Sequence, residues 1–391
     1  MNQRELFFSH LAQTSPSPLA LEIVHAEGMT LTDRDGKKFL DLIGGISVCN
    51  LGHRHPKIIE AVKSQVDQYL HLLVYGEFIQ SPQVLYAKEL TDHLPSSLDN
   101  VYFTNSGTEA TEGAMKLAKR ATNRTEMIAF RHSYHGSTQG SLSLMGDEQW
   151  RNAFRPLLPG VLHLDFNEVS SLQLITEKTA CVITEAVQAE RGVYAASVEW
   201  MLALRKKCNE TGAIWILDEI QTGFGRTGTL WCFQQYNVFP DILLLGKALG
   251  GGMPLGAFIA HHQLMTILTN HPVLGHITTF GGHPVSCAAG LAAFRGLIDE
   301  GWIGRVAWNE EFFKKRLHHP KIKAYRSKGL LIALEFESFD VNKKIIDRCI
   351  SEGLLVDWFL FAPHCMRIAP PLIISEKEIE QACSIILGAL N

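Results

Sequence analysis

Short apolar runs alternate with amphipathic stretches between about residues 100 and 260, and this alternation constrains the fold more than any other feature. The helical patterns include residues 109–122 and 198–211, the second followed by Gly212, a typical helix C-cap. Strands separated by helices predict a mostly parallel sheet covered on both faces, with ligands at the carboxyl ends of the strands. The strand-like runs are VYFT, MIAF, VLHLDF, ACVITEA, AIWIL, DILLLG and AFIA.

Two domains suit a chain of 391 residues. Residues 1–20 are polar, contain proline and resemble a docking arm. After about residue 290 the pattern changes to helix, mixed segment, helix and final helix, which indicates a smaller α/β domain. We therefore expect an N-terminal arm and part of the small domain over 1–50, a large domain over 51–285, and the rest of the small domain over 286–391.

Composition excludes several classes of protein. A net charge of −4 lacks the basic footprint of nucleic-acid binders. No run approaches the ~18 apolar residues that a membrane helix needs, and the N-terminus has no apolar signal region. The eight cysteines form no C-x-x-C pair, so we expect no metal site, reduced thiols and a cytoplasmic location.

A glycine pattern at residues 223–228 matches G-x-G-x-x-G, but its context argues against a dinucleotide turn. Polar and mixed residues separate it from the preceding strand, and a poor helix opener follows Gly228. Asp218, at the end of that strand, is the stronger candidate. A buried carboxylate needs a partner, and for this residue alone a helix N-terminus, an arginine, a metal or a protonated heterocycle all remain open.

Two further segments carry candidate chemistry. Lys247 follows the strand DILLLG and precedes several glycines, so burial would lower its pKa and make the amine nucleophilic, although a surface lysine is the alternative. The turn with Ser106, Gly107 and Thr108 joins a strand to a helix, where backbone N–H groups and hydroxyls can cradle a phosphate. An ordinary helix N-cap is the alternative for this turn.

Taken together, a phosphate cup, an acid for a ring nitrogen and a lysine for an aldehyde match pyridoxal 5′-phosphate. The segments LDEIQTGFGRTG and LLLGKALGGGMPLGA, with Asp218 and Lys247 29 residues apart, resemble the class III pyridoxal-phosphate aminotransferases. The likeness extends from DLIGGISVCNLGHRHP to MRIAPPLIISEKEIE. It implies an α/β protein of fold type I, with a mostly parallel seven-stranded sheet in the large, cofactor-binding domain.

The resemblance also implies roles for individual residues. Lys247 would link covalently to the cofactor and move the proton, Asp218 would pair with the ring nitrogen, and Glu185 would lie near the reacting end of the substrate. Thr279 would reach the phosphate from a partner subunit, which implies a homodimer with shared active sites. The other expected cofactor contacts are Ser106, Gly107, Thr108, Tyr134, His135, Ile220 and Gln221.

For the substrate, Arg367 resembles the arginine that binds an α-carboxylate, and Glu190 the gate residue that pairs with it. The chain departs from the family at Ser137, where an arginine often binds the distal carboxylate, and at Ile46, where ornithine enzymes carry tyrosine. Arg191 replaces a usual glycine; it either supplies a relocated positive charge or is a surface arginine.

The expected activity is transfer of an amino group from an ω-amino acid or related amine to an oxo acid, 2-oxoglutarate first. The amino donor is expected to resemble acetylornithine, ornithine or 4-aminobutyrate. An amine:pyruvate aminotransferase, an aminomutase and a decarboxylase of the same fold remain alternatives. A non-enzymatic binding protein and a nicotinamide dehydrogenase are the alternatives from other classes.

Overall fold

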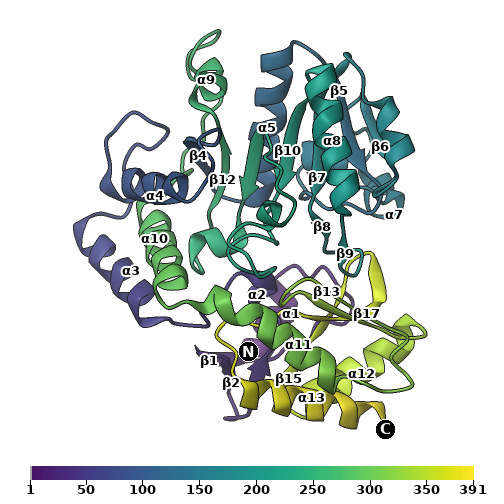
Figure 1. The fold of residues 1–391 in the computed structure, drawn as a ribbon. Coiled ribbons are helices and arrows are strands. Elements are labelled where there is room, and N and C mark those ends of the chain that lie inside the picture. Colours follow the sequence, from purple (N-terminus) through teal and green to yellow (C-terminus); the bar gives the residue numbers. More distant parts are fainter. Residues whose placement is uncertain (1) are drawn as a thin grey trace.

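The computed structural model describes residues 2–391, and its centre is a seven-stranded sheet within that range (Figure 1). Strand β12 runs antiparallel to both neighbours, and the other pairs are parallel. The expected mostly parallel seven-stranded sheet is thereby confirmed. In spatial order the strands are β4 (Asn100–Thr104), β12 (Gly256–Ala260), β11 (Ile242–Leu245), β10 (Ile214–Asp218), β7 (Thr179–Glu185), β5 (Glu126–Phe130) and β6 (Val161–Leu164).

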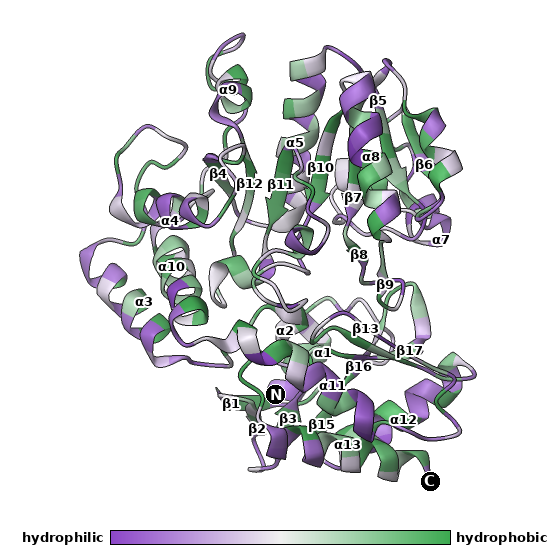
Figure 2. Cartoon of the chain, in the orientation of Figure 1, coloured by the Kyte–Doolittle hydropathy of each residue, from purple (hydrophilic) through white to green (hydrophobic). Residues whose placement is uncertain are grey.

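The central strands of this sheet are hydrophobic, as their green colour in Figure 2 shows. Along β10, Trp215 and Leu217 join one hydrophobic cluster, whereas Ile216 joins the other. This alternation follows from the two-residue period of a strand. Helix α8 (Val198–Thr211) packs Trp200 on the first face, and α5 (Gly107–Thr122) packs Ala114 on the second. The covered faces explain why the strands read as continuous apolar runs.

The helices begin and end at residues that the sequence indicates. Helix α3 (Pro56–Gln68) starts with proline in its first turn, and α8 ends at Gly212 with a φ of 67°. Residues 3–10 form an exposed helix, where the sequence predicted only a polar arm. The remaining helices are α1 (Gln3–His10), α2 (Gly44–Ser47), α4 (Ser81–Asp92), α6 (Gln139–Leu144), α7 (Glu148–Arg151), α9 (His262–Met265), α10 (Pro284–Asp299), α11 (Val306–Arg316), α12 (Phe339–Ser351) and α13 (Glu376–Leu390).

Two four-stranded sheets within residues 2–391 lie on the other side of the molecule (Figure 1). One joins the two ends of the chain, because β3 pairs in parallel with β15. It contains β1 (Ile23–Glu27), β2 (Thr30–Asp33), β3 (Lys38–Asp41) and β15 (Leu354–Leu355). The other contains β13 (Ala324–Ser327), β14 (Ile332–Glu335), β17 (Ala362–Ile368) and β16 (Asp357–Phe359), and a small ribbon joins β8 (Val187–Gln188) to β9 (Tyr194–Ala195). The domain boundaries at residues 50 and 285 stay predictions.

Six strands of the large sheet, all except β12, run in the same direction, so their carboxyl ends lie at one edge. Glu185 and Asp218 are the last residues of β7 and β10, and Lys247 follows β11 after one glycine. Gly107 opens α5 just beyond β4, and His135 lies in the segment after β5. Residues far apart in the sequence therefore lie together where open α/β sheets bind ligands. Among the described residues, no helix has the length and apolar character to cross a membrane.

Candidate active site

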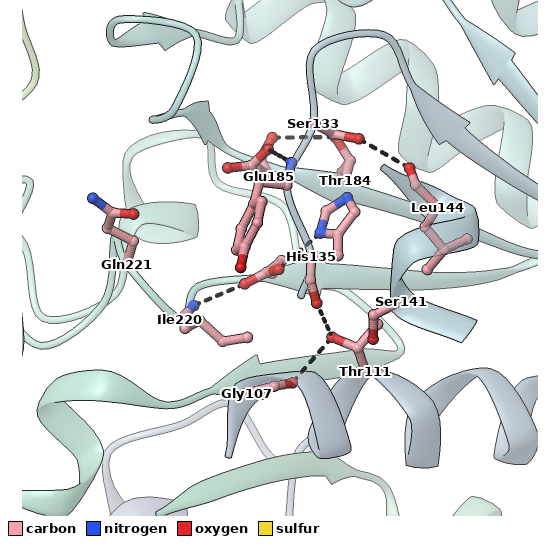
Figure 3. Close-up of polar contacts among 12 residues, drawn as sticks. Gly107, Thr111, Ser133, His135, Ser141, Leu144, Thr184, Glu185, Ile220 and Gln221 are labelled. Carbon is pink, nitrogen blue, oxygen red and sulfur yellow. Dashed lines mark hydrogen bonds and ion pairs between the residues drawn. The ribbon is translucent and has the colours of Figure 1, made fainter. Parts of the chain in front are cut away.

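Asp218 is buried at the sheet edge with 5% of its surface exposed, and two neighbours donate to its carboxylate. His135 Nδ1 lies 2.8 Å from Asp218 Oδ2, and the backbone N–H of Ile220 donates to Oδ1 at 2.9 Å. Figure 3 labels His135 and Ile220, the two residues that make these contacts. The predicted need for a donor is met by a histidine whose side chain is itself buried. His135 Nε2 has no hydrogen-bond partner among the described residues.

Glu185 lies beside Asp218 because β7 and β10 pair these two residues in register. The backbone N–H of Tyr134 donates to Glu185 Oε2 at 3.3 Å. Burial raises the pKa of Glu185 well above its ordinary value, and the nearby negative charge of Asp218 raises it further. Glu185 therefore holds its proton more tightly than an exposed carboxyl group does.

Lys247 begins a 3₁₀ turn, Lys247–Gly250, directly after β11. Its φ of +45° is left-handed, a strained conformation that side chains adopt mainly at functional sites. The amine Nζ donates to Gln221 Oε1 at 3.3 Å. Burial lowers the pKa of Lys247, although the carboxylates of Glu190 and Asp218 raise it. The result is an amine with more neutral, nucleophilic character than a surface lysine has.

Glycines let the backbone approach closely around Ile220. A Cβ on Gly107 would lie 2.7 Å from Ile220 Cδ1, and one on Gly246 would lie 3.2 Å from Ile220 Cγ2. At Gly136, with a φ of +125°, a Cβ would lie 2.3 Å from Thr108 Oγ1. The segments that carry Asp218, Lys247 and the start of α5 therefore converge only because these positions lack a side chain.

The start of α5 provides a cup of backbone N–H groups. Ser106 is its N-cap, and the Ser106 hydroxyl accepts the N–H of Glu109 at 3.3 Å. The N–H groups of Gly107 and Thr108 have no acceptor inside the helix, and the helix dipole favours an anion beside them. Thr108 Oγ1 also lies 2.7 Å from Thr138 Oγ1. This geometry suits a phosphate held by Gly107 and Thr108, with Ser106 ordering the turn.

These groups surround one cavity of about 320 Å³, which Figure 3 shows in part between Glu185, Gln221 and Gly107. Its size and its few convergent polar groups are typical of a cofactor or small-molecule site. The lining residues are Gly107, Thr108, Tyr134, His135, Gly136, Ser137, Glu185, Glu190, Asp218, Ile220, Gln221, Thr222 and Lys247.

Arg367 lies on β17 next to this cavity, held by two carboxylates. Glu190, which lines the cavity, accepts Arg367 Nη1 at 2.8 Å. Asp357 accepts Nε at 2.8 Å and Nη2 at 2.5 Å. Burial alone would lower the pKa of Arg367, but the two carboxylates raise it above its ordinary value. The predicted pairing of Arg367 with Glu190 is thus present in the structure.

Some predicted site residues lie outside the lining of this cavity. Ile46 is 41% exposed and has a φ of 64° in the short α2 segment. Thr279 is exposed on the loop before α10, and its contact with a partner subunit stays a prediction. Arg191 stacks over Tyr194, with 4.5 Å from its Cζ to the ring centroid, and donates to Gln188 Oε1 at 3.2 Å. The structure therefore gives Arg191 a local packing role outside the cavity lining.

Two acidic residues of this region escaped the sequence analysis. Asp357 binds Arg367 as described above. Glu219 is fully buried and accepts the backbone N–H groups of Cys232 and Phe233, both at 2.7 Å. The signal for Glu219 was its place beside Asp218, where strand alternation sends the two side chains to opposite sides.

The known proteins that this chain resembles are aminotransferases, and they match it over nearly its whole length. The acetylornithine aminotransferase of Bacillus cereus is 37% identical over 97% of this chain and 96% of its own length. The [LysW]-aminoadipate semialdehyde/glutamate semialdehyde transaminase of Sulfurisphaera tokodaii is 39% identical over 93% of this chain and 92% of its own. The structure of ornithine aminotransferase from Toxoplasma gondii, with PLP at partial occupancy, superposes with a TM-score of 0.90 at 28% identity, covering 99% of this chain and 94% of the other.

Pyridoxal 5′-phosphate is the cofactor that these relatives indicate, and the residues of the cavity fit it. The glycine-lined start of α5 leaves two backbone N–H groups for a phosphate, and buried Asp218 retains acceptor capacity beside Lys247. The model of the family "Aminotransferase class-III" matches residues 11–390. This chain therefore belongs to the class III aminotransferases, pyridoxal-phosphate enzymes of fold type I.

Proposed function

We propose that this enzyme transfers an amino group from an ω-amino acid or a related amine to an oxo acid. The single observation that carries this proposal is the convergence of Lys247, Asp218 and Glu185 on one cavity with the Arg367–Glu190 pair at its edge. Relatives named as acetylornithine, ornithine and [LysW]-aminoadipate semialdehyde/glutamate semialdehyde aminotransferases support an ω-amine as the donor. The acceptor that we propose first is 2-oxoglutarate.

Asp218 and His135 serve the ring of the cofactor. Pyridoxal 5′-phosphate, when bound, supplies an electron-accepting ring whose nitrogen must stay protonated. The carboxylate of Asp218 stabilises that proton, and His135 orients the carboxylate through the contact at 2.8 Å. Tyr134 and Ile220 line the cavity and provide its ring-packing surfaces.

Lys247 performs the proton transfer in this proposal. Its amine is held by Gln221 and kept partly neutral by burial, so it can attack a carbonyl and later accept or return a proton. Glu185, whose pKa is raised by burial, lies near the reacting end in this proposal and in its protonated form donates to a leaving or arriving oxygen.

A homodimer completes the site in this proposal, with the partner's Thr279 at the phosphate. Exposed apolar side chains near the loop that carries Thr279 support such an interface, since Ile79 is 96% and Val273 is 70% exposed. Large exposed apolar patches mark interaction sites on soluble proteins. Sedimentation of wild type and Thr279→Ala tests this: dimers in both, with weaker cofactor binding in the variant, support it, and a monomeric holoenzyme refutes it.

An amine:pyruvate aminotransferase is the second candidate. Ser137 lines the cavity at the position where the family resemblance leads us to expect an arginine for a distal carboxylate. Of the described residues that line the cavity, Lys247 is the one lysine or arginine. The described lining therefore offers no arginine for the distal carboxylate of a dicarboxylate acceptor such as 2-oxoglutarate. Pyruvate has no second carboxylate and needs no such partner.

We also propose a cytoplasmic location. All eight cysteines are free among the described residues, and seven of them are buried, which suits a reducing compartment.

The experiment that tests the function measures half-reactions of the purified holoenzyme. A panel of ω-amino acids and amines is mixed with it, and the visible absorbance of the lysine-bound cofactor is followed. Pyruvate or 2-oxoglutarate is then added in the reverse direction. Loss of the band with an amine and its return with an oxo acid support transamination, whereas release of carbon dioxide or no change with any donor refutes it.

A further inference from the structure

Asp357 occupies a complete edge of the Arg367 guanidinium. The contacts of 2.8 Å from Nε and 2.5 Å from Nη2 form a two-pronged ion pair, the geometry that a substrate carboxylate would itself adopt. Glu190 takes a third N–H from Nη1. Three of the five guanidinium donors thus point at carboxylate oxygens of this chain.

Strand register builds this pair into the fold. Asp357 on β16 lies directly opposite Arg367 on β17, so both side chains project from the same face of the sheet. The Asp357 side chain is 22% exposed and that of Arg367 is 6% exposed. Because two neighbouring strands fix the pair, Asp357 stays beside Arg367 without any loop movement.

Glu190 differs from Asp357 in that backbone N–H groups of a turn hold it in place. Its carboxylate accepts the backbone N–H of Leu360 at 2.9 Å, in the turn between β16 and β17, and its carbonyl accepts that of Phe361 at 3.0 Å. Even when the Glu190 side chain leaves Arg367, Asp357 still neutralises the guanidinium. An arriving α-carboxylate then meets a guanidinium whose charge is already neutralised and whose Nε–Nη2 edge is already occupied by Asp357.

The charge of the cavity points in the same direction. Its lining contains the carboxylates of Glu190 and Asp218, whereas burial favours the neutral form of Glu185 and Ser137 adds no charge. A donor whose reacting carbon carries only hydrogen avoids placing a second carboxylate among these groups. A donor with an α-carboxylate must place it against the already paired Arg367.

We propose that Asp357 is a specificity-determining residue that weakens α-carboxylate binding at Arg367, so that the enzyme prefers primary ω-amines as donors. This inference rests on the proposed function and deepens it. The preferred class is amines whose reacting carbon bears no carboxylate, with any carboxylate several bonds away.

A pair of donors and one isosteric variant test the proposal. 4-Aminobutyrate is L-glutamate without its α-carboxylate, so the ratio of their half-reaction rate constants (maximal rate over dissociation constant) isolates that group. We expect wild type to favour 4-aminobutyrate at least tenfold. Asp357→Asn keeps the shape of the side chain and removes its charge, and we expect it to shift the ratio toward glutamate at least tenfold.

The control is Glu335→Gln, which removes a carboxylate from the Glu335–Arg326 ion pair between β13 and β14 of the same sheet. Neither residue contacts Arg367, so we expect this variant to keep the wild-type ratio. A general loosening of the sheet would instead change the ratio in both variants and would overturn the proposal.

The remaining outcomes are separable. If Asp357→Asn shifts the ratio away from glutamate, Asp357 positions Arg367 for the α-carboxylate and the inference is wrong. If wild type already prefers glutamate, the inference is wrong even when the variant fails to fold. If neither these donors nor any amine of the wider panel reacts with wild-type holoenzyme, the proposed function fails, which is a different result from a reversed ratio.

Discussion

Two charged clusters around the cavity differ in whether their groups stay ionised. The cofactor end contains Glu185, Asp218 and Lys247, and the substrate end contains Arg367, Glu190 and Asp357. At the cofactor end, burial raises the pKa of Glu185 and lowers that of Lys247, so both groups shift toward their neutral forms. At the substrate end, Glu190 and Asp357 raise the pKa of Arg367, so that this side chain keeps its charge. The difference lies in pairing, because Arg367 forms ion pairs with two carboxylates, whereas the side-chain hydrogen bond of Lys247 within residues 2–391 goes to the neutral amide of Gln221.

This contrast separates two tasks. Buried acids and bases whose pKa values shift toward their neutral forms are suited to proton exchange in acid–base catalysis. Arg367, paired with two carboxylates, keeps its charge and exchanges no proton. It instead determines which ligand groups can bind beside it. The cofactor end therefore carries the chemistry, and the substrate end carries the choice of donor.

The largest effect is expected when the amine of Lys247 is removed from the cofactor end. Lys247→Ala should fold normally but lower the half-reaction rate by more than about 10³-fold, because neither covalent attachment nor proton transfer is then available. Stopped-flow absorbance with an amine donor measures the rate, and circular dichroism checks the fold. A rate within tenfold of wild type would refute the role of Lys247.

The second-largest effect is expected when the charge of Asp218 is removed. Asp218→Asn should slow the half-reaction by roughly 10²-fold or more and weaken cofactor binding, because the ring nitrogen loses the carboxylate that keeps it protonated. Equilibrium dialysis of the cofactor and the same kinetic trace provide the two readouts. Asp241→Asn, at a carboxylate that pairs with Arg205 away from the cavity lining, is the matched control. Wild-type kinetics in Asp218→Asn would count against the account.

A smaller effect is expected at the substrate end. Glu190→Gln can still accept the N–H of Leu360 but removes one charge from Arg367. L-Glutamate should then bind about fivefold more tightly, less than the change expected for Asp357→Asn, because Glu190 makes one contact where Asp357 makes two. Titration of the half-reaction with glutamate measures this. Tighter binding in Glu190→Gln than in Asp357→Asn would reverse the ranking of the two carboxylates.

The last prediction concerns the pH dependence of stability at Glu219, beside the cofactor end, where no change in the rate of transamination is expected. Burial raises its pKa from 4.5 to about 7 in the folded protein, so between these values the folded state holds a proton that the unfolded state releases. Stability should therefore fall as pH rises from 4.5 to 7, by on the order of 3 kcal/mol at most from this group. Urea titrations should show a flatter pH slope in Glu219→Gln than in wild type. The exposed control Glu199→Gln should keep the wild-type slope, and an unchanged slope in Glu219→Gln would contradict the assignment.

Much of the cofactor end could be predicted from the sequence. Asp218 and Lys247 end or follow apolar runs, and parallel strands bring their carboxyl ends to one edge, so the meeting of these residues follows from the pattern. The contact between His135 and Asp218 was not foreseen, because it depends on how the segment after β5 turns back over the sheet. No pattern of period two or 3.6 describes such a segment.

The substrate end was predictable only in part. Arg367 and Glu190 were expected to pair, but Asp357 was not identified. The hairpin between β16 and β17 has an irregular register between Trp358 and Phe359, so counting residues back from the turn does not give the partner of Arg367. An ion pair across a bulged hairpin becomes visible only when the strands are placed in space.

The covalent site of the cofactor tests the account most directly. The holoenzyme is reduced with borohydride, which fixes the cofactor to its lysine, and is then digested and mapped by mass spectrometry. We expect the added pyridoxyl mass on the peptide that contains Lys247, with the other lysines unmodified. An unmodified Lys247 in a fully reduced holoenzyme, or the added mass on a different lysine, would contradict the account.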